Sequence, residues 1–413
     1  MRKFLALFMV VVFAASYAPC VLASGFYIYH QDTKAQGQAG AFTAQADNPS
    51  AIYYNPAGMS QLKGTQFNLG TRIFRLETNY KDSYGNSEDL EAKWQPVPSV
   101  FLTSDFTTEK WTFGLGVFAP YGLSTKWSGD GLLRYCATKT SFNMIDINPS
   151  ISYKFCPEFS LGAGVDYYNV YSYVSEVKQN FMVADANTKL DVDGDGWGFN
   201  LGALWKPHPK HNFGLAFRSA VDVELTGSLK TEDIPTVFGL PPVISYGAKT
   251  NVNLPATVTG GYAFRPTEKL KLEADISWVQ FSNIDKAEIK DRDTGELLSY
   301  INKDWNDTWI FALGGEYLIN DNWSLRAGYS YQQNAVPEKT FNPSVPDANM
   351  NVVALGLGYN KSGWTIDVAY AIGLYSNRDI ETDYYGLGAV LPDASGKYDS
   401  LIHIIGVSVG YAF

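Results

Sequence analysis

From Leu401 to the C-terminus, the side chains alternate between two kinds with a period of two residues. One face carries mostly bulky apolar groups: Leu401, His403, Ile405, Val407, Val409, Tyr411 and Phe413. The other face becomes small and polar toward its end: Ile402, Ile404, Gly406, Ser408, Gly410 and Ala412. Apolar bulk outward with small or polar residues inward is typical of a transmembrane β-barrel. No segment beyond residue 23 has 18 consecutive apolar residues, so a closed barrel is the remaining way for this chain to cross a membrane.

The same alternation recurs along the chain, for example at 269–281, 323–332 and 364–372. We predict strands near 64–78, 95–106, 109–120, 139–155, 159–174, 195–206, 212–228, 248–264, 269–284, 305–319, 323–334, 350–360, 364–376 and 399–413. Short turns rich in Pro, Asn, Asp and Gly alternate with longer loops near 79–94, 121–138, 175–194, 229–247, 285–304, 335–349 and 377–398. Outer-membrane barrels have short periplasmic turns and long extracellular loops. The predicted fold class is therefore all-β, a 14-stranded antiparallel transmembrane β-barrel with both termini on the periplasmic side.

The first residues have the pattern of a secretory signal peptide. Arg2 and Lys3 precede an apolar run from Phe4 to Ala15, and we place the cleavage after Ala23. The chain has 42 acidic and 32 basic side chains, which gives a net charge of -10. An exported acidic chain is poorly suited to neutralising phosphates, so we predict no nucleic-acid partner.

Residues 24–63 precede the first predicted strand and show no alternation. They are rich in Gly and Ala and include proline turns, which argues for a compact segment. A barrel of this size encloses more space than its wall side chains fill. We therefore predict three parts: a signal peptide at 1–23, an N-terminal hatch, or plug, at 24–63 in the lumen, and the transmembrane barrel at 64–413.

Several stretches resemble one family in the order in which they occur. The run from Gly37 to Asp47, followed by Asn55-Pro56-Ala57-Gly58-Met59, resembles the hatch of the FadL/TodX family of outer-membrane transporters. Further similar stretches are Pro120-Tyr121-Gly122-Leu123, Arg134-Tyr135, Ile147-Asn148-Pro149-Ser150 and the terminal Phe413. Members of this family take up long-chain fatty acids, and its TodX-like branch takes up aromatic hydrocarbons. The resemblance implies a channel in the outer membrane of a Gram-negative bacterium for hydrophobic molecules of either class.

The resemblance also implies a mechanism. In the family, a hatch blocks the lumen, the substrate moves from an outer groove to an inner pocket, and hatch movement opens a sideways exit at a kink in the third strand. In this chain that strand is 109–120, where two glycines would permit a kink and a proline cannot donate to the ladder. The residues expected to serve the hatch are Asn55, Pro56, Ala57 and Gly58, and those expected at the lateral gap are Gly114, Gly116 and Pro120.

Candidate substrate contacts lie in the long loops. The apolar residues expected to bind substrate are Phe181, Phe238, Leu240, Val243 and Ile244. Exposed apolar groups often mark a binding surface, although these loops could also pack on each other. Arg134 is the best candidate to bind a carboxylate, because it lies in the family-like Arg-Tyr stretch. A neutral aromatic substrate would require no cation.

We predict no enzymatic activity, no cofactor and no metal. Asp191, Asp193 and Asp195 resemble the start of a calcium loop, but Gly202 stands where the final Glu is needed, so we interpret 191–196 as a tight acidic turn. The alternatives are a general diffusion porin or an outer-membrane barrel enzyme. The expected partners are a hydrophobic small molecule, outer-membrane lipid and lipopolysaccharide, and the barrel assembly machinery. We expect a monomer.

Overall fold

The computed structural model describes residues 25–381 and 394–413, without the side chain of Phe238. The predicted signal peptide lies outside these residues. The strands are β1 (Thr65–Lys81), β2 (Ser87–Asp89), β3 (Gln95–Ser104), β4 (Trp111–Phe118), β5 (Gly122–Lys126), β6 (Lys139–Cys156), β7 (Phe159–Asn180), β8 (Asp185–His208), β9 (His211–Arg218), β10 (Val221–Glu232), β11 (Val243–Leu254), β12 (Thr257–Phe264), β13 (Leu270–Val279), β14 (Lys286–Asp291), β15 (Leu297–Asn302), β16 (Thr308–Leu318), β17 (Trp323–Gln332), β18 (Met350–Lys361), β19 (Trp364–Tyr375), β20 (Arg378–Ile380) and β21 (Gly396–Ala412). The helices are α2 (Thr33–Gln36), α3 (Ala51–Tyr54), η1 (Pro56–Gln61), η2 (Thr236–Phe238), η3 (Phe281–Asn283) and η4 (Glu338–Thr340). None of the helices among the described residues has the length and hydropathy to cross a membrane.

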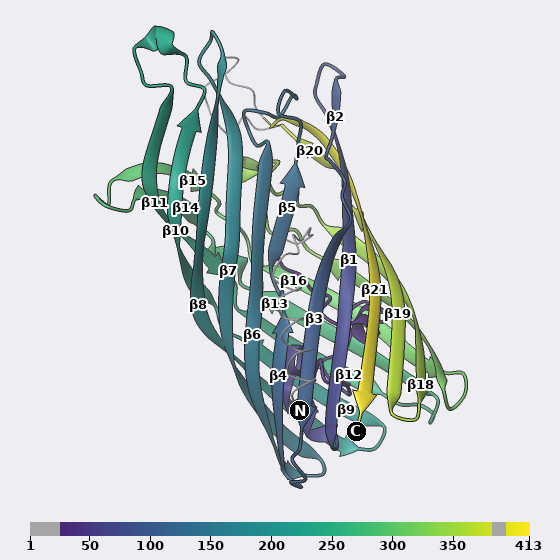
Figure 1. Ribbon diagram of the computed structural model, residues 1–413. Coiled ribbons are helices and arrows are strands. Elements are labelled where there is room, and N and C mark those ends of the chain that lie inside the picture. Colours follow the sequence, from purple (N-terminus) through teal and green to yellow (C-terminus); the bar gives the residue numbers. More distant parts are fainter. Residues whose placement is uncertain (1–24, 382–393) are drawn as a thin grey trace.

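The strands form one antiparallel sheet that closes on itself (Figure 1). β1 pairs with β21 from Gln66↔Ala412 to Lys81↔Lys397, which joins the first strand to the last. Three wall strands are each interrupted once, so that β4 continues as β5, β9 as β10 and β11 as β12. The result is a closed barrel of 14 antiparallel strands, and the predicted fold class is confirmed.

The wall strands face lipid on one side and the lumen on the other. In β17, Leu325 and Tyr329 are exposed on the outer face, whereas Arg326 and Ser330 are buried in the interior. The alternation read from the sequence therefore sets the orientation of the wall side chains, because successive residues of a strand point to opposite faces. The interior face is polar, so its buried donors and acceptors need hydrogen-bond partners from another part of the chain.

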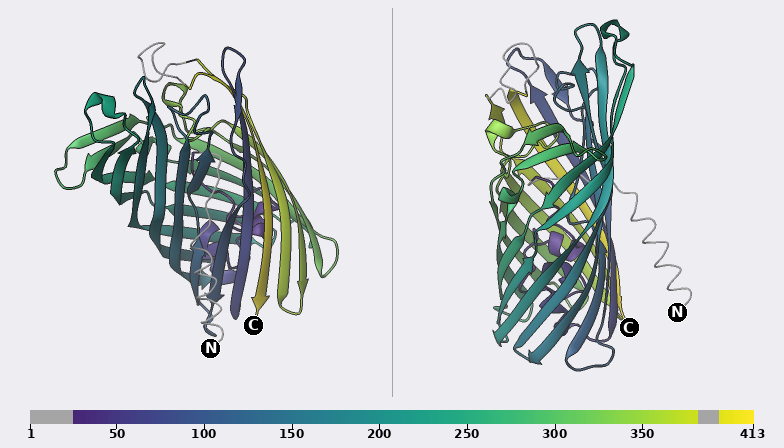
Figure 2. Two further views of the ribbon diagram at one scale, coloured as in Figure 1. Left: turned by 45° about the horizontal axis from the view of Figure 1, so that its top comes forward. Right: turned by 90° about the vertical axis from the view of Figure 1, so that its left-hand side faces the viewer.

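Residues 25–63, here called the hatch, lie inside the barrel and supply these partners (Figure 2). Almost all of its residues are buried, including Phe42, Ile52 and Met59. Its three helices are short, and two of them begin at a residue whose side chain caps the helix. Asp32 accepts the Ala35 N–H at the start of α2 (3.1 Å), and the side chain of Asn55 accepts an N–H at the start of η1.

The extracellular ends of several strands are longer than predicted. β7 and β8 pair up to Asn180↔Asp185, and β10 and β11 up to Glu232↔Val243, so strand occupies much of the predicted loops 175–194 and 229–247. The predicted loop 285–304 contains the hairpin β14–β15. The β7–β8 and β10–β11 hairpins rise above the rim of the barrel at the upper left of Figure 1.

The acidic run 191–196 lies within β8, so the prediction of a tight turn there is wrong. Asp191, Asp193 and Asp195 are exposed, and they alternate with Val192 and Gly194. This alternation has the period of a strand, and pairing with β7 and β10 satisfies the main chain. Among the residues that the structure describes, no group of three or more His, Cys, Asp or Glu side chains is arranged to hold a metal ion.

Candidate functional site

The barrel wall is interrupted between β3 and β5. β4 pairs with β3 only from Val100↔Val117 to Ser104↔Phe113, and β5 pairs only with β6 in the described part of the chain. The other half of β3, residues 95–99, pairs with β1 alone. This interruption, here called the wall break, follows directly after Phe118, where Ala119 and Pro120 leave the line of the strand.

Prolines border the wall break on both sides. Pro96 and Pro98 lie in the half of β3 that has one neighbour, and Pro120 lies at the turn between β4 and β5. A proline has no N–H to leave unpaired, so it suits a strand edge at which no ladder forms. Pro120 is one of the residues expected at the lateral gap, and it lies next to this interruption; Pro96 and Pro98 are not among the predicted residues.

Gly114 and Gly116 do not cause this interruption, so the prediction that they permit the kink is wrong. Both lie where β4 is regularly paired with β3 and β6. A Cβ atom on Gly114 would come within 2.5 Å of Met59 Sδ and 2.8 Å of Ile52 Cδ1. These glycines leave room for the hatch, which approaches the wall too closely for a side chain.

The first residues of the hatch cover the wall break from inside. Residues 25–31, here called the arm, hydrogen-bond to the turn between β4 and β5: Ile28 N–H donates to the Pro120 carbonyl (2.8 Å), and Gly122 N–H donates to the Phe26 carbonyl (2.9 Å). The Gln31 side chain also donates to the carbonyl of Ala119 (2.8 Å). The arm thus serves as a short substitute strand for main-chain groups that the wall leaves unpaired.

A cavity of about 90 Å³ lies beside the arm, on the extracellular side of the hatch. Its lining includes the aromatic residues Phe26, Phe142, Tyr173 and Trp305, and we call it the aromatic pocket. The ring of Phe26 lies 5.6 Å from that of Phe142 and 5.8 Å from that of Trp305. One wall of this apolar cavity therefore belongs to the arm, which also covers the wall break.

Lys303 lies at the edge of the aromatic pocket. Its Nζ atom is 5.9 Å from the centre of the Trp305 ring, and burial lowers the pKa of this side chain to about 8. Lys286 also lines the pocket but pairs with Glu288 at 2.5 Å. Among the described residues, Lys303 has no acidic partner within ion-pair distance. The pocket therefore combines an apolar interior with one uncompensated cation.

The residues predicted to bind substrate lie elsewhere, and the structure does not bring them to the aromatic pocket. Arg134 pairs with Asp185 at 3.3 Å and donates to the Tyr135 hydroxyl at 3.0 Å. The predicted loop residues lie near the tips of two hairpins: Phe181 lies beside the β7–β8 turn, Phe238 and Leu240 lie in the β10–β11 connection, and Val243 and Ile244 begin β11. Leu240 and Val243 are exposed there, which fits an outer surface that apolar molecules could meet first.

Sequence reasoning missed Lys303, Trp305 and Phe26 as a group. Phe26 is separated from Lys303 and Trp305 by about two-thirds of the chain, and Lys303 lies at the end of a predicted loop that otherwise gave no signal. A lysine two residues before a tryptophan at the start of a strand is an ordinary pattern near a membrane interface. Only the folded barrel places these side chains around one cavity.

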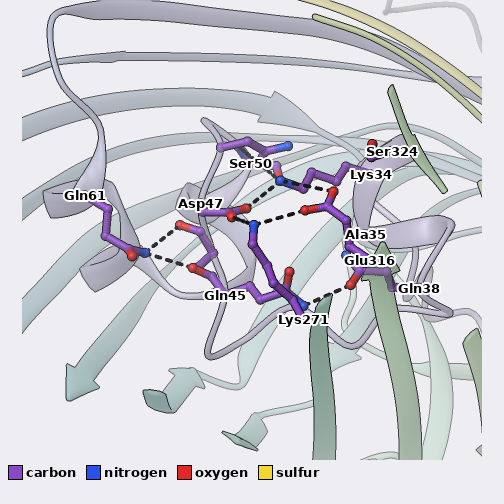
Figure 3. Close-up of polar contacts among 12 residues, drawn as sticks. Lys34, Ala35, Gln38, Gln45, Asp47, Ser50, Gln61, Lys271, Glu316 and Ser324 are labelled. Atoms are coloured by element: carbon purple, nitrogen blue, oxygen red, sulfur yellow. Dashed lines mark hydrogen bonds and ion pairs between the residues drawn. The ribbon is translucent and has the colours of Figure 1, made fainter. Parts of the chain in front are cut away.

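Ion pairs also join the hatch to the barrel wall, through strands β13 and β16 (Figure 3). Lys271 of β13 contacts Asp47 of the hatch at 2.8 Å and Glu316 of β16 at 3.0 Å. Lys34 of α2 also contacts Asp47 at 2.8 Å. In addition, Arg326 of β17 contacts Glu316 at 2.7 Å. Because these groups are largely buried, breaking one partner would leave the others without compensation.

Two neighbouring acids of β13 bind the hatch main chain. Glu273 accepts the N–H groups of Ala44 (2.6 Å) and Gln45 (2.9 Å). Asp275 accepts those of Phe42 (2.9 Å) and Thr43 (3.0 Å). Hydrogen bonds to a charged acceptor are stronger than neutral ones, so this contact fixes the middle of the hatch to the wall.

The predicted hatch residues Asn55, Pro56, Ala57 and Gly58 lie against β7 and β8. The Asn55 side chain donates to the carbonyls of Thr43 (2.9 Å) and Ala203 (3.0 Å). A Cβ atom on Gly162 would lie 2.3 Å from the Pro56 carbonyl carbon, and one on Gly202 would lie 2.2 Å from Asn55 Oδ1. The wall and this turn of the hatch are thus fitted to each other at van der Waals distance.

Comparisons with known proteins agree with this architecture. Residues 11–413 match the family model described as outer membrane protein transport protein (OMPP1/FadL/TodX). The long-chain fatty acid transport protein of Escherichia coli O6:H1 is 24% identical over 434 residues, which cover 95% of each chain. The crystal structure of a Pseudomonas aeruginosa FadL homologue has a TM-score of 0.84 at 23% identity, and covers 94% of this chain and 100% of that chain. The P. putida toluene transporter TodX has a TM-score of 0.74 at 19% identity, and covers 95% of this chain and 99% of that chain.

The family match covers nearly the whole chain, from before the hatch to the last strand. Members of this family are outer-membrane channels for hydrophobic substrates, not enzymes. The same assignment places this protein in the outer membrane of a Gram-negative bacterium. The chain belongs to the OMPP1/FadL/TodX family of outer membrane transport proteins.

Proposed function

We propose that this protein takes up long-chain fatty acids and releases them sideways through the wall break. The observation that carries the proposal is Lys303 at the edge of the aromatic pocket. An apolar pocket with one cation matches a molecule that has a long apolar chain and a single carboxylate. The two ends of such a molecule would meet the two kinds of surface that this pocket offers.

The unpaired charge of Lys303 favours a fatty acid over an aromatic hydrocarbon. A cation removed from water loses hydration energy, which a carboxylate can restore and a neutral ring restores only partly. The lowered pKa of Lys303 reports this loss, because burial disfavours the charged form. A bound hydrocarbon would leave the cost uncompensated, whereas a carboxylate would form a charge-assisted hydrogen bond.

The proposed route follows the apolar surfaces. Exposed residues at the hairpin tips, such as Met182 and Val237, would receive the molecule outside the lipopolysaccharide layer. It would then enter the aromatic pocket, displace the arm and pass through the wall break into the membrane. A route through the wall suits an apolar molecule, because it never has to enter the water below the hatch.

Ligand binding tests the substrate. Purified protein in detergent is titrated with radiolabelled oleic acid, oleyl alcohol and toluene. We expect oleic acid to bind the wild type, and Lys303→Met to weaken that binding about tenfold or more, since a hydrogen bond between charged groups is worth about 1.5–3 kcal/mol. Oleyl alcohol should bind both proteins similarly. Toluene binding that exceeds oleic acid binding and is indifferent to Lys303 would instead support an aromatic hydrocarbon channel.

Uptake by cells tests the lateral exit. Ala119→Trp adds bulk at the wall break, where the Ala119 side chain is buried. Ala327→Trp is a matched control on the lipid-facing side of β17. We expect Ala119→Trp to reduce oleate uptake severalfold while pocket binding persists, and the control to behave as the wild type. Unchanged uptake by a correctly inserted Ala119→Trp variant would mean that the substrate leaves down the lumen.

A further inference from the structure

Arg218 is a buried cation at the end of β9, at the level of the hatch. Its Nη1 atom lies 3.0 Å from Asp146 of β6 and also contacts Asp166 of β7. Both acids are completely buried. Three wall strands, β6, β7 and β9, thus contribute charged side chains to one buried cluster in the lumen.

Two aromatic rings lie within cation–π distance of this guanidinium group. The Tyr53 ring, from α3 of the hatch, is centred 5.2 Å from Arg218 Cζ. The Phe118 ring, at the last position of β4 before the wall break, is centred 5.5 Å from it. The two rings also contact each other, with their centres 5.3 Å apart. Cation–π contacts of this kind are stronger where water is excluded.

Tyr53 connects this cluster to the arm. Its hydroxyl group lies 2.8 Å from that of Tyr27, within hydrogen-bonding distance. Tyr27 forms a β-bridge with Tyr121 across the wall break. Its neighbour Phe26 lines the aromatic pocket. A continuous set of contacts therefore runs from the pocket through the arm to the strand end at the wall break.

The aromatic pocket is small compared with the molecule that it is proposed to bind. Its volume of about 90 Å³ is well below the roughly 300–1,000 Å³ typical of small-molecule sites. A long acyl chain can enter only if a lining side chain moves. Among the residues that line the pocket, Phe26 alone belongs to the arm. A displacement of the arm at Phe26 would move the adjacent Tyr27 and separate the Tyr27 and Tyr53 hydroxyl groups.

We infer that Arg218 is a positioning residue that holds the arm and the end of β4 in the closed arrangement, and that a fatty acid in the aromatic pocket opens the wall break by releasing the Tyr27–Tyr53 contact. The inference rests on the proposed function and adds to it how binding is coupled to exit. Arg218 touches no substrate in this scheme. It acts through Tyr53 and Phe118.

Linkage distinguishes this role from a merely structural one. If the ligand must break the Tyr27–Tyr53 contact to bind, part of its binding free energy is used for that purpose. Removing the contact in advance must then tighten binding, because coupling between two equilibria is reciprocal. A variant that only damages the fold would bind equally well or more weakly.

The experiment uses the full mature chain in detergent and titration with radiolabelled oleic acid. Tyr53→Phe removes the hydroxyl group and keeps the ring over Arg218. Tyr80→Phe is the matched control, because its buried hydroxyl group donates to the Ser395 carbonyl (2.7 Å), far from the arm. We expect oleic acid to bind Tyr53→Phe about threefold to tenfold more tightly than the wild type, the effect of one hydrogen bond. The control should bind as the wild type does.

Arg218→Lys gives a second, ligand-free readout. Lysine keeps the positive charge but lacks the planar guanidinium group that Arg218 places over the two rings. In this variant and in Tyr53→Phe, the Ile28 and Gly122 amides, which bond across the wall break, should exchange hydrogen faster than in the wild type. Unchanged affinity and unchanged exchange in Tyr53→Phe, with the wild type binding oleic acid, would overturn the inference and leave the proposed function intact. No oleic acid binding to the wild type would refute the proposed function and this inference with it.

Discussion

The side-chain amide of Asn148 donates a hydrogen bond of 2.9 Å to the main-chain carbonyl of Val165. Pro149, the next residue of β6, has no N–H, and the ladder between β6 and β7 is interrupted between Ile147↔Tyr167 and Ser150↔Gly164. A side chain thus supplies a donor in the middle of the wall, where lipid offers none. The Asn-Pro pair works as a unit: the asparagine compensates for the proline.

Asn148→Leu should therefore destabilise the barrel by about 1–3 kcal/mol, the cost of leaving a buried acceptor without a donor. Reversible urea unfolding in lipid vesicles measures this difference. Asn360→Leu, at an exposed position of β18, should have a much smaller effect. Adding Pro149→Val to Asn148→Leu restores a main-chain N–H and should recover part of the loss. If Asn148→Leu unfolds as the wild type does, the compensation is not needed.

Glu273→Gln should loosen the hatch. The glutamate accepts two main-chain N–H groups of the hatch, at 2.6 and 2.9 Å, whereas glutamine has one oxygen and turns an NH₂ group toward the other donor. We expect transient ion conductance in planar bilayers to become about tenfold more frequent, since hydrogen bonds to a charged group are each worth about 1.5–3 kcal/mol. Glu268→Gln, in an exposed turn, is the control. Equal conductance in both variants would argue against a plug held by β13.

Deleting residues 25–60 tests the hatch as a whole. The β1–β21 ladder that closes the barrel does not include these residues, so the wall should still assemble, as heat-modifiable migration on gels would report. Steady ion conductance should rise and selective oleate uptake should be lost, because the lumen is then open and the arm is gone. A truncated barrel that is inserted but conducts no better than the intact one would show that another part of the chain closes the lumen.

Oleic acid binding should depend on pH through Lys303. The pKa of this lysine is lowered to about 8, so the side chain is mostly cationic below that pH and loses its charge as the pH rises through it. A fatty acid carboxylate stays ionised in this range, and its affinity should fall about tenfold between pH 7 and about 9.5. Lys303→Met should bind weakly at every pH, and Lys303→Arg should keep its affinity at high pH. Oleyl alcohol, which has no charge, should show no such dependence.

The architecture was accessible from the sequence because the period of two is a local property. Each strand reports its own inward and outward faces, and Pro, Asn, Asp and Gly mark the turns between strands. The observed β13, at Leu270–Val279, lies within the predicted strand 269–284. The same reasoning failed for 191–196, where an acidic composition was given more weight than the alternation that the residues also have.

The candidate site was much less accessible, because it depends on contacts across the lumen. Arg134 is favoured on local resemblance, but it has Asp185 as a partner, and that contact joins two separate loops. Periodicity gives the direction of a side chain and says nothing of what lies opposite it. The arm, which pairs with Pro120 from the far end of the hatch, was beyond any local pattern for the same reason.

The tight fit between hatch and wall has a consequence for the order of assembly. The hatch is joined directly to β1, and β1 closes the ring by pairing with β21, the final strand of the chain. Gly162 and Gly202 meet the hatch so closely that a single added carbon would collide with it, which leaves no clearance for threading the segment into a finished ring. The hatch must therefore already be inside when the first and last strands join, so that β1 and β21 pair around a segment that is already in place.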